Sequence, residues 1–359
     1  MRSMLSRINN EIHRLGRFLA FGRDKTVPDH VAELLASVGE DEGRVPLSWV
    51  RSTATVPYSN LGDQLSSIIV SAITQRPVSH VNFDSSRTRL LAIGTIGQQQ
   101  RAGTIHIWGS GFDNLSRKAA GIAEPFLGFP EVTYWAHALR GPFSARLLQD
   151  IGLPSSGIYG DPAWFLPKIF HGQPAKKHEL GVIPHLAELE QRSPAPIPKP
   201  ALRRYAGGVA DGVKLISTYH EPNWDGFRLK VKEILSCKRI ISRSLHGLII
   251  ADAFKIPCLY VSPIDEGPQR LSIDTDERIL DRRFADAYAG FGSSRILSFG
   301  MPMKSSTNWA RIIRAIDDFW EPISFTGAEL FNSFPLPKAV DFDQQDWSLP
   351  QALVSSLEW

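Results

Sequence analysis

Hydrophobic positions along the chain follow two periodicities, and together these predict strands that are followed by helices. Short runs of β-branched and aliphatic residues, such as 89–97, 104–112, 239–242 and 256–263, are typical of buried strands. Other stretches, such as 308–323, carry apolar residues three and four positions apart and predict amphipathic helices. Strands that alternate with helices indicate an α/β fold with parallel sheets.

The length of the chain and one proline-rich stretch predict two lobes. A chain of 359 residues is too long for one ordinary hydrophobic core. The stretch 191–200 carries four prolines without periodicity, which is typical of a stiff, solvated connector. The predicted division is an N-terminal segment over 1–45, an N-terminal lobe over 46–195, a C-terminal lobe over 196–335 and a C-terminal tail over 336–359. In open α/β sheets, ligands bind beyond the carboxyl ends of the strands, so we expect a site in a cleft between the lobes.

The first 25 residues have the pattern of a basic amphipathic helix. Apolar residues recur at helical spacing among six arginines and lysines. Such a helix can lie on an anionic membrane face, which makes residues 1–21 a candidate for peripheral membrane contact. It can equally pack on its own protein or on a second subunit, because the pattern alone does not separate these readings.

Composition and charge narrow the classes of partner and compartment. A formal net charge of +3 without long single-sign blocks argues against a nucleic-acid partner. The two cysteines, Cys237 and Cys258, lie in apolar stretches without a CxxC pair, so we expect reduced core thiols and no zinc. No His, Asp and Glu set has convincing metal-ligand spacing, so no metal is predicted. No apolar stretch approaches the ~20 residues of a bilayer span, and no signal-peptide pattern is present, so the expected location is cytoplasmic.

The turn after the predicted strand 239–242 carries candidate chemistry. Its candidates are Ser242, Arg243, Ser244, His246 and Gly247. Free N–H groups at the start of the following helix favour an anion, and the arginine adds a charge-assisted contact. Either serine could cap the helix, the glycine permits close approach, and the histidine can carry a proton near neutral pH. The alternative reading is a capped helix with a satisfied histidine.

Further polar residues and glycines fall at other predicted strand ends. These candidates are Asn60, Asp63, Gly109, Ser110, Arg140, Asp161 and His185. Each alone is ordinary turn chemistry. Their joint position, at the edge where both lobes would face a cleft, favours a binding site over a set of unrelated turns.

These turns resemble, in order, the motifs of the polysaccharide pyruvyl transferase family. "SRSLHGLIIADAFKIP" is similar to the family signature (S/D)xRLHG-xxxA-xxxxP. The other matching stretches are "NLGDQLS", "WGSGF", "LRGPFSARLLQDIG", "YGDPAWFLP", "VIPH" and "RRFADAYAGFG", and the resemblance covers about residues 55–300. It implies two Rossmann-like lobes in a glycosyltransferase-B-like (GT-B-like) arrangement.

The same resemblance implies an activity and its partners. The implied reaction transfers the pyruvyl group of phosphoenolpyruvate to a sugar of a bacterial exopolysaccharide or cell-surface repeat unit, which leaves a cyclic pyruvate ketal and free phosphate. Phosphoenolpyruvate is the donor substrate, and no further cofactor is expected. The acceptor would be lipid-linked, which would place the enzyme at the inner face of the plasma membrane.

Candidate roles follow from this chemistry. His246 would carry the proton, and Asp63 and Asp161 would orient or deprotonate the acceptor hydroxyl. Arg140 and Arg243 would hold the anionic groups of the donor. His185 could assist from either lobe.

The chain departs from the family pattern at two places. Where the family motif has an arginine before the leucine, this chain has Ser244, and Arg243 stands one position earlier. The role of the family's arginine therefore does not transfer directly to Arg243. The tyrosine pair of the last motif is Ala287 and Tyr288. Two other functions therefore remain open, a GT-B glycosyltransferase with a nucleotide-sugar donor and a non-catalytic partner in polysaccharide assembly.

Overall fold

The computed structural model describes residues 27–117, 123–172, 174–206, 212–264 and 267–359. The basic amphipathic helix predicted for residues 1–21 lies outside these ranges. Within them, no helix combines the length and the apolar character needed to cross a bilayer.

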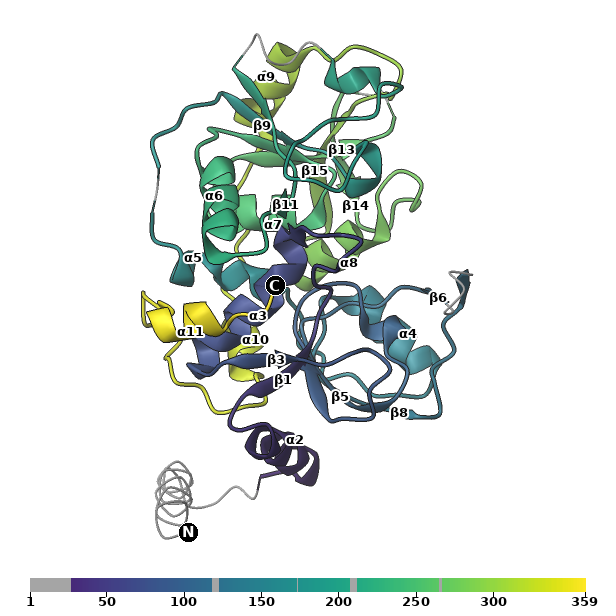
Figure 1. Ribbon diagram of the computed structural model, residues 1–359. Coiled ribbons are helices and arrows are strands. Elements are labelled where there is room, and N and C mark those ends of the chain that lie inside the picture. The colour runs from purple at the N-terminus through teal and green to yellow at the C-terminus, as the bar shows by residue number, and fades with distance from the viewer. Residues whose placement is uncertain (1–26, 118–122, 173, 207–211, 265–266) are drawn as a thin grey trace.

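The first sheet has five parallel strands in the order β3-β1-β4-β5-β8 and occupies the lower part of Figure 1. Its strands are β1 (Val45–Ser48), β3 (Val78–His80), β4 (Arg89–Leu91), β5 (Gly103–Trp108) and β8 (Val132–Ala138). Leu47, Leu90, Ile105 and Ile107 are fully buried. Runs of this kind are expected in parallel sheets, because both faces are covered.

The second sheet has six strands in the order β10-β9-β12-β13-β15-β14, and only β14 is antiparallel to its neighbour. Its strands are β9 (Leu180–Ile183), β10 (Val213–Leu215), β12 (Ile240–Ser242), β13 (Cys258–Ser262), β14 (Pro268–Ser272) and β15 (Arg295–Gly300). Neighbouring residues of β12 enter different hydrophobic cores. Ile240 packs with the helices α6 (Trp224–Leu235) and α7 (Leu245–Ala253), whereas Ile241 packs with α9 (Trp309–Phe319). Both faces of this sheet are therefore buried, and the predicted α/β class with parallel sheets is confirmed.

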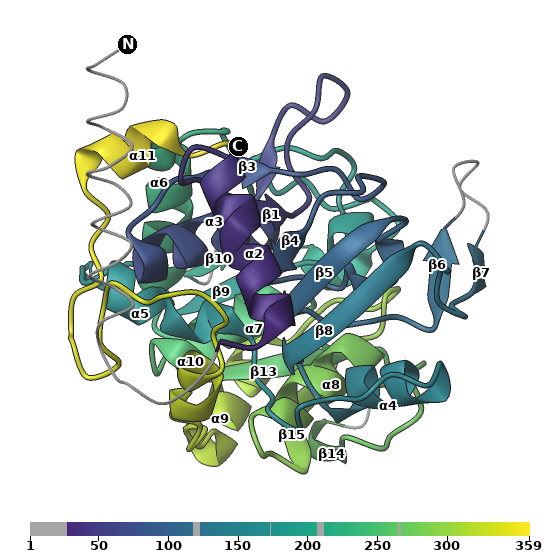
Figure 2. The same cartoon turned by 90° about the horizontal axis from the view of Figure 1, so that it is seen from below.

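Helices and short elements complete the chain. The helices are α2 (Asp29–Glu40), α3 (Leu61–Thr74), α4 (Pro142–Asp150), α5 (Leu166–Ile169), α6 (Trp224–Leu235), α7 (Leu245–Ala253), α8 (Arg282–Gly290), α9 (Trp309–Phe319), α10 (Ala328–Asn332) and α11 (Gln351–Ser356). The 3₁₀ helices are η1 (Gly97–Gln99), η2 (Pro162–Phe165), η3 (Leu186–Glu188) and η4 (Arg203–Tyr205). The short pairs are β2 (Ser59–Asn60) with β11 (Tyr219–His220), and β6 (Leu115–Arg117) with β7 (Ala123–Pro125). Viewed from below, α2 lies across the outer side of the first half (Figure 2).

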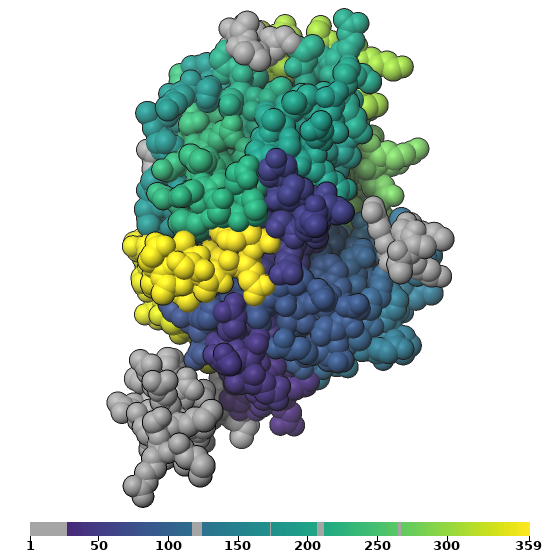
Figure 3. Space-filling view, in the orientation of Figure 1, coloured from purple at the N-terminus to yellow at the C-terminus, as the bar shows by residue number. Residues whose placement is uncertain are grey.

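Helix α3 joins the two halves of the molecule. It is buried along almost its whole length and packs against η2, α5 and α7. The segment that leads into it carries β2, which pairs with β11 of the second half through Ser59↔His220. Figure 3 shows this segment on the surface across the junction of the two halves. The starts of α3 and α7 are thereby brought together at this junction.

The division between the sheets differs from the predicted boundary. Strand β9 pairs with β10 and β12, so the chain enters the second sheet at residue 180. The proline-rich stretch 191–200 therefore follows a strand of the second half and does not separate the two sheets. Its backbone makes an antiparallel bridge, Leu189↔Pro198, within a loop of that half.

The C-terminal segment returns from the second half to the first, as the yellow elements of Figure 1 show. Trp347 is fully buried, and its ring lies 5.3 Å from that of Phe165. Its backbone N–H donates to the carbonyl of Lys168 at 2.7 Å. The N–H of Ala339 donates to the carbonyl of Ile73 in α3. The tail therefore stabilises the same region that joins the halves.

The stretch 157–167 forms a short helix instead of a sheet strand. It contributes the bridge Leu139↔Tyr159 and then forms η2. Asp161 accepts a hydrogen bond from the N–H of Ala163, and Pro162 stands at the first helical position. This proline has no N–H for a ladder, and the aspartate caps the turn, so a helix is favoured.

Candidate active site

Three segments that are far apart in the sequence meet around the imidazole of His246. Its Nε2 lies 3.5 Å from Oδ2 of Asp161, and its side chain is 13% exposed. A Cβ added at Gly62 would lie 2.1 Å from its Nδ1, so the start of α3 touches the other side of the ring. The first turns of α3, η2 and α7 therefore form one polar cluster at the junction of the two halves.

Asn60 sets the start of α3. Its side-chain oxygen accepts hydrogen bonds from the N–H groups of Gly62 at 3.0 Å and Asp63 at 3.4 Å. Its amide nitrogen donates to the hydroxyl of Thr218 at 2.9 Å. Asn60 is therefore a helix cap that links the halves, and its polar atoms serve the fold instead of facing a ligand.

Asp63 stands in the first turn of α3 beside this cluster and is half-buried. Burial raises the pKa of its carboxyl to about 6, although the positive charges of His246 and Arg283 oppose the rise. A carboxyl group with this pKa can accept or donate a proton near neutral pH. The sequence-based choice of Asp63 as a candidate acid or base is thus compatible with its surroundings.

Asp161 is fully buried and uses its two oxygens differently. Oδ1 caps η2 by accepting from the N–H of Ala163 at 2.9 Å. Oδ2 accepts no hydrogen bond from the described residues and faces the His246 ring. An unpaired buried oxygen is costly, so this geometry favours a carboxylate that orients the imidazole.

The turn before α7 is organised by Ser242. Its hydroxyl donates to the carbonyl of Ser244 at 2.7 Å and accepts from the N–H of Ser244 at 2.8 Å. Ser244 occupies the cap position of α7, but its side chain makes no cap hydrogen bond, so the predicted serine cap is wrong. The first N–H groups of α7 are therefore left without a side-chain cap, an arrangement that suits an anion.

Three predicted candidates pack the fold instead. A Cβ at Gly247 would meet Oγ of Ser242 at 2.5 Å, so this glycine lets α7 pack on the turn. Gly109 has a φ of 92°, and its Cβ would meet Pro162 at 2.3 Å. Ser110 is fully buried and donates to the carbonyl of Gly94 at 2.8 Å. Gly109 thus lets the end of β5 approach the loop that carries Asp161, whereas Ser110 ties it to the loop after β4.

Arg140 was expected to bind the donor, but the structure places it in a buried ion pair. Its side chain is 1% exposed, and its Nη2 lies 2.9 Å from Oδ2 of Asp286. Oδ1 of Asp286 also accepts from the N–H groups of Phe143 and Ser144, so a carboxylate from α8 caps α4. Asp286 lies within the motif "RRFADAYAGFG", yet its role as a cap for a distant helix has no local signal.

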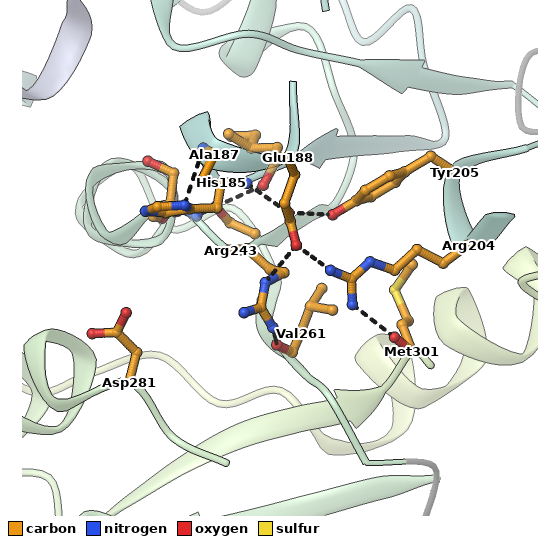
Figure 4. Close-up of polar contacts among 12 residues, drawn as sticks. His185, Ala187, Glu188, Arg204, Tyr205, Arg243, Val261, Asp281 and Met301 are labelled. Atoms are coloured by element: carbon orange, nitrogen blue, oxygen red, sulfur yellow. Dashed lines mark hydrogen bonds and ion pairs between the residues drawn. The ribbon is translucent and has the colours of Figure 1, made fainter. Parts of the chain in front are cut away.

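His185 and Arg243 belong to a second cluster, centred on Glu188 (Figure 4). Burial, followed by the charge of Arg283, lowers the pKa of His185. The backbone N–H of His185 donates to the Glu188 carboxylate at 2.9 Å, and Nε of Arg243 lies 3.0 Å from the same carboxylate. Sequence reasoning missed Glu188 and Arg283. His185 and Glu188 form a capping box around η3. Their three-residue spacing is the sequence signal that could have identified Glu188.

The structure thus brings together His246, Asp161 and Asp63 with the uncapped start of α7, and it gives Asn60, Gly109, Ser110, Gly247 and Arg140 supporting positions.

Comparison with known proteins gives one family match. Residues 96–265 match the family model described as polysaccharide pyruvyl transferase. The match includes Asp161 and His246, whereas Asp63 and Asp286 lie outside it. No curated protein matches the chain. Over residues 96–265, the chain is thus similar to the polysaccharide pyruvyl transferases, a family of transferase enzymes.

Proposed function

We propose that this protein transfers the pyruvyl group of phosphoenolpyruvate to a sugar of a bacterial exopolysaccharide or cell-surface repeat unit, forming a cyclic ketal. The observation that carries the proposal is the convergence of His246, Asp161 and Asp63 at the junction of the two halves. We also propose that the halves act as the two lobes of a GT-B-like enzyme, with the substrates held between them.

The reaction requires two proton transfers and one leaving group. The methylene carbon of the donor gains a proton and becomes the methyl group of the ketal. Two hydroxyls of one sugar attack the neighbouring carbon, and each loses its proton. The bond from that carbon to the phosphate oxygen breaks, and inorganic phosphate leaves. One hydroxyl proton balances the new methyl group, and the other leaves with the phosphate.

The clustered residues fit these steps. His246, oriented by Asp161, would protonate the methylene carbon of the donor. Asp63, with a pKa of about 6, would accept a proton from an attacking hydroxyl. The N–H groups at the start of α7 would face the developing negative charge of the departing phosphate.

The acceptor and its location complete the proposal. A repeat unit under assembly is carried on a lipid, and residues 1–21 would hold the enzyme close to the inner membrane face by their basic amphipathic pattern.

The proposal is tested by following the donor and the product together. Purified enzyme is incubated with phosphoenolpyruvate and lipid-linked oligosaccharides from the producing cell, and phosphate release is measured while proton NMR follows the ketal methyl group. We expect both signals from the wild type and a loss of about 100- to 10,000-fold in rate for His246→Ala.

His171→Ala is the matched control, because His171 is 43% exposed and pairs with Asp346 on the surface. It should keep the wild-type rate. A wild type that releases no phosphate and instead binds nucleotide sugars would contradict the proposed reaction. Full ketal formation by His246→Ala would remove His246 from its role.

A further inference from the structure

The two arginines first assigned to the donor are engaged elsewhere. The Arg140 guanidinium is buried against Asp286. Arg243 lies with its Nε 3.0 Å from Glu188 and donates from Nη1 to the carbonyl of Val261 at 3.0 Å. Neither side chain is directed by its contacts toward the cluster of Asp63 and His246.

The Glu188 cluster explains why Arg243 is held in this way. The Glu188 carboxylate also accepts from Nη2 of Arg204 and from the hydroxyl of Tyr205, and Figure 4 shows it placed between these groups and Arg243. The side chain of Arg204 is almost fully buried, and that of Glu188 is largely buried. A shared buried carboxylate fixes the direction of Arg243, so an arginine one position before Ser244 is no replacement for an arginine at Ser244.

Arg283 offers a cation that contacts the Glu188 cluster only through His185. It lies in the first turn of α8, where Nε and Nη2 grip both oxygens of Asp281, at 3.0 and 2.7 Å. Nη2 also lies 3.2 Å from Nε2 of His185, and the side chain is 33% exposed. Among the residues that the structure describes, its Nη1 makes no hydrogen bond.

The charge of Arg283 acts across the junction of the halves. It lowers the pKa of Asp63, on α3, and the charge of Asp113, after β5, helps to raise the pKa of Arg283 itself. Arg283 is thus a cation of the second half whose charge reaches carboxylates of the first half. Bidentate pairing with Asp281 fixes the guanidinium plane while one edge stays open.

We propose that Arg283 binds an oxyanion of the donor and supplies the positive charge that Ser244 lacks. This inference rests on the proposed function, because it takes phosphoenolpyruvate as the donor. The open Nη1 edge and the uncapped N–H groups of α7 would share the anionic groups of the ligand.

The test is calorimetric titration of the full chain with phosphoenolpyruvate, and separately with inorganic phosphate and with pyruvate. Arg283→Gln should raise the Kd for phosphoenolpyruvate by about 10- to 100-fold, and Arg283→Lys, which keeps the charge but loses the fork, should raise it less. If Arg283 binds the phosphate group of the donor, Arg283→Gln should weaken the binding of inorganic phosphate more than the binding of pyruvate. The opposite order would assign Arg283 to the carboxylate group of the donor.

Arg282→Gln is the matched control, since Arg282 is the neighbouring residue and pairs with Glu277 on the surface. Its Kd should equal that of the wild type, and thermal unfolding should show that the Arg283 variants are folded. Wild-type affinity in folded Arg283→Gln, with a loss in Arg243→Gln, would overturn the inference and leave the proposed function intact. A wild type that does not bind phosphoenolpyruvate would overturn both.

Discussion

The contact between Gly62 and His246 makes Gly62→Ala a sharp test of the site geometry. The new methyl carbon would lie 2.1 Å from Nδ1 of the imidazole, whereas ordinary contact begins at 3.4 Å. The ring would therefore have to retreat by about 1.3 Å, the difference between these distances. It would move toward Asp161, whose Oδ2 is already 3.5 Å away on the other side.

Two opposing contributions set the size of the effect on stability. Overpacking costs about 1–3 kcal/mol, while replacing glycine with alanine in a helix returns up to about 1 kcal/mol. We expect a net loss of about 1 kcal/mol in the free energy of unfolding. Activity is more sensitive, because a misplacement of about 1 Å can lower a rate by about 100-fold.

The assay compares phosphate release and urea unfolding in Gly62→Ala and in Gly39→Ala. Gly39 is the matched control, since it also lies in a helix and a Cβ added there would meet nothing within 4 Å. Gly39→Ala should keep its activity and its stability or gain slightly. A Gly62→Ala variant with wild-type kcat and unchanged unfolding would refute the contact between α3 and the imidazole.

Two further predictions concern buried charge. Asp286→Ala leaves the buried Arg140 without its partner and should lower the free energy of unfolding by about 3–5 kcal/mol in urea titrations. Asp225→Ala, at an 85% exposed side chain, is its control, and equal losses in the two variants would contradict this account. Burial lowers the pKa of His106 to about 3 and of His137 to about 4, whereas unfolded histidine titrates near about 6.5. Because the unfolded chain then binds protons first, the stability contributed by these histidines is present above about pH 7 and is lost as pH falls toward 4. Urea midpoints between pH 7.5 and 5 should fall less in a His106→Gln/His137→Gln variant, and an equal fall would count against these two histidines.

The sequence predicted the elements that place the site more reliably than the contacts within it. The apolar run 239–242 followed by an apolar helix correctly located the turn that carries His246, and the strand over 104–112 correctly located the turn at Gly109. Periodicity predicts such elements because each must bury one face or both. It gives no information on which elements are neighbours across the junction.

The misplaced residues have a common physical origin. Arg140 follows a strand end just as a ligand-binding arginine would, but its partner, Asp286, is 146 residues away in the sequence. Neither serine caps α7, because the Ser242 hydroxyl is engaged by the backbone of Ser244, and Ser244 itself makes no cap hydrogen bond. In each case a polar group found a partner through tertiary packing or turn geometry, and neither is encoded in local residue type.

The contact between Gly62 and His246 can be tested more stringently by combining substitutions at both positions, because only the fold brings these two residues together. Gly62 and His246 belong to separate stretches, each of which looks complete by itself. In the His246→Ala background the ring is absent, so the alanine at position 62 should be tolerated and keep only its helix-forming advantage. A double-variant cycle should then give a coupling of about 1–3 kcal/mol, since residues in contact do not contribute independently. Additive losses would place the imidazole away from α3, and they would remove the geometry by which Asp63, Asp161 and His246 form one site.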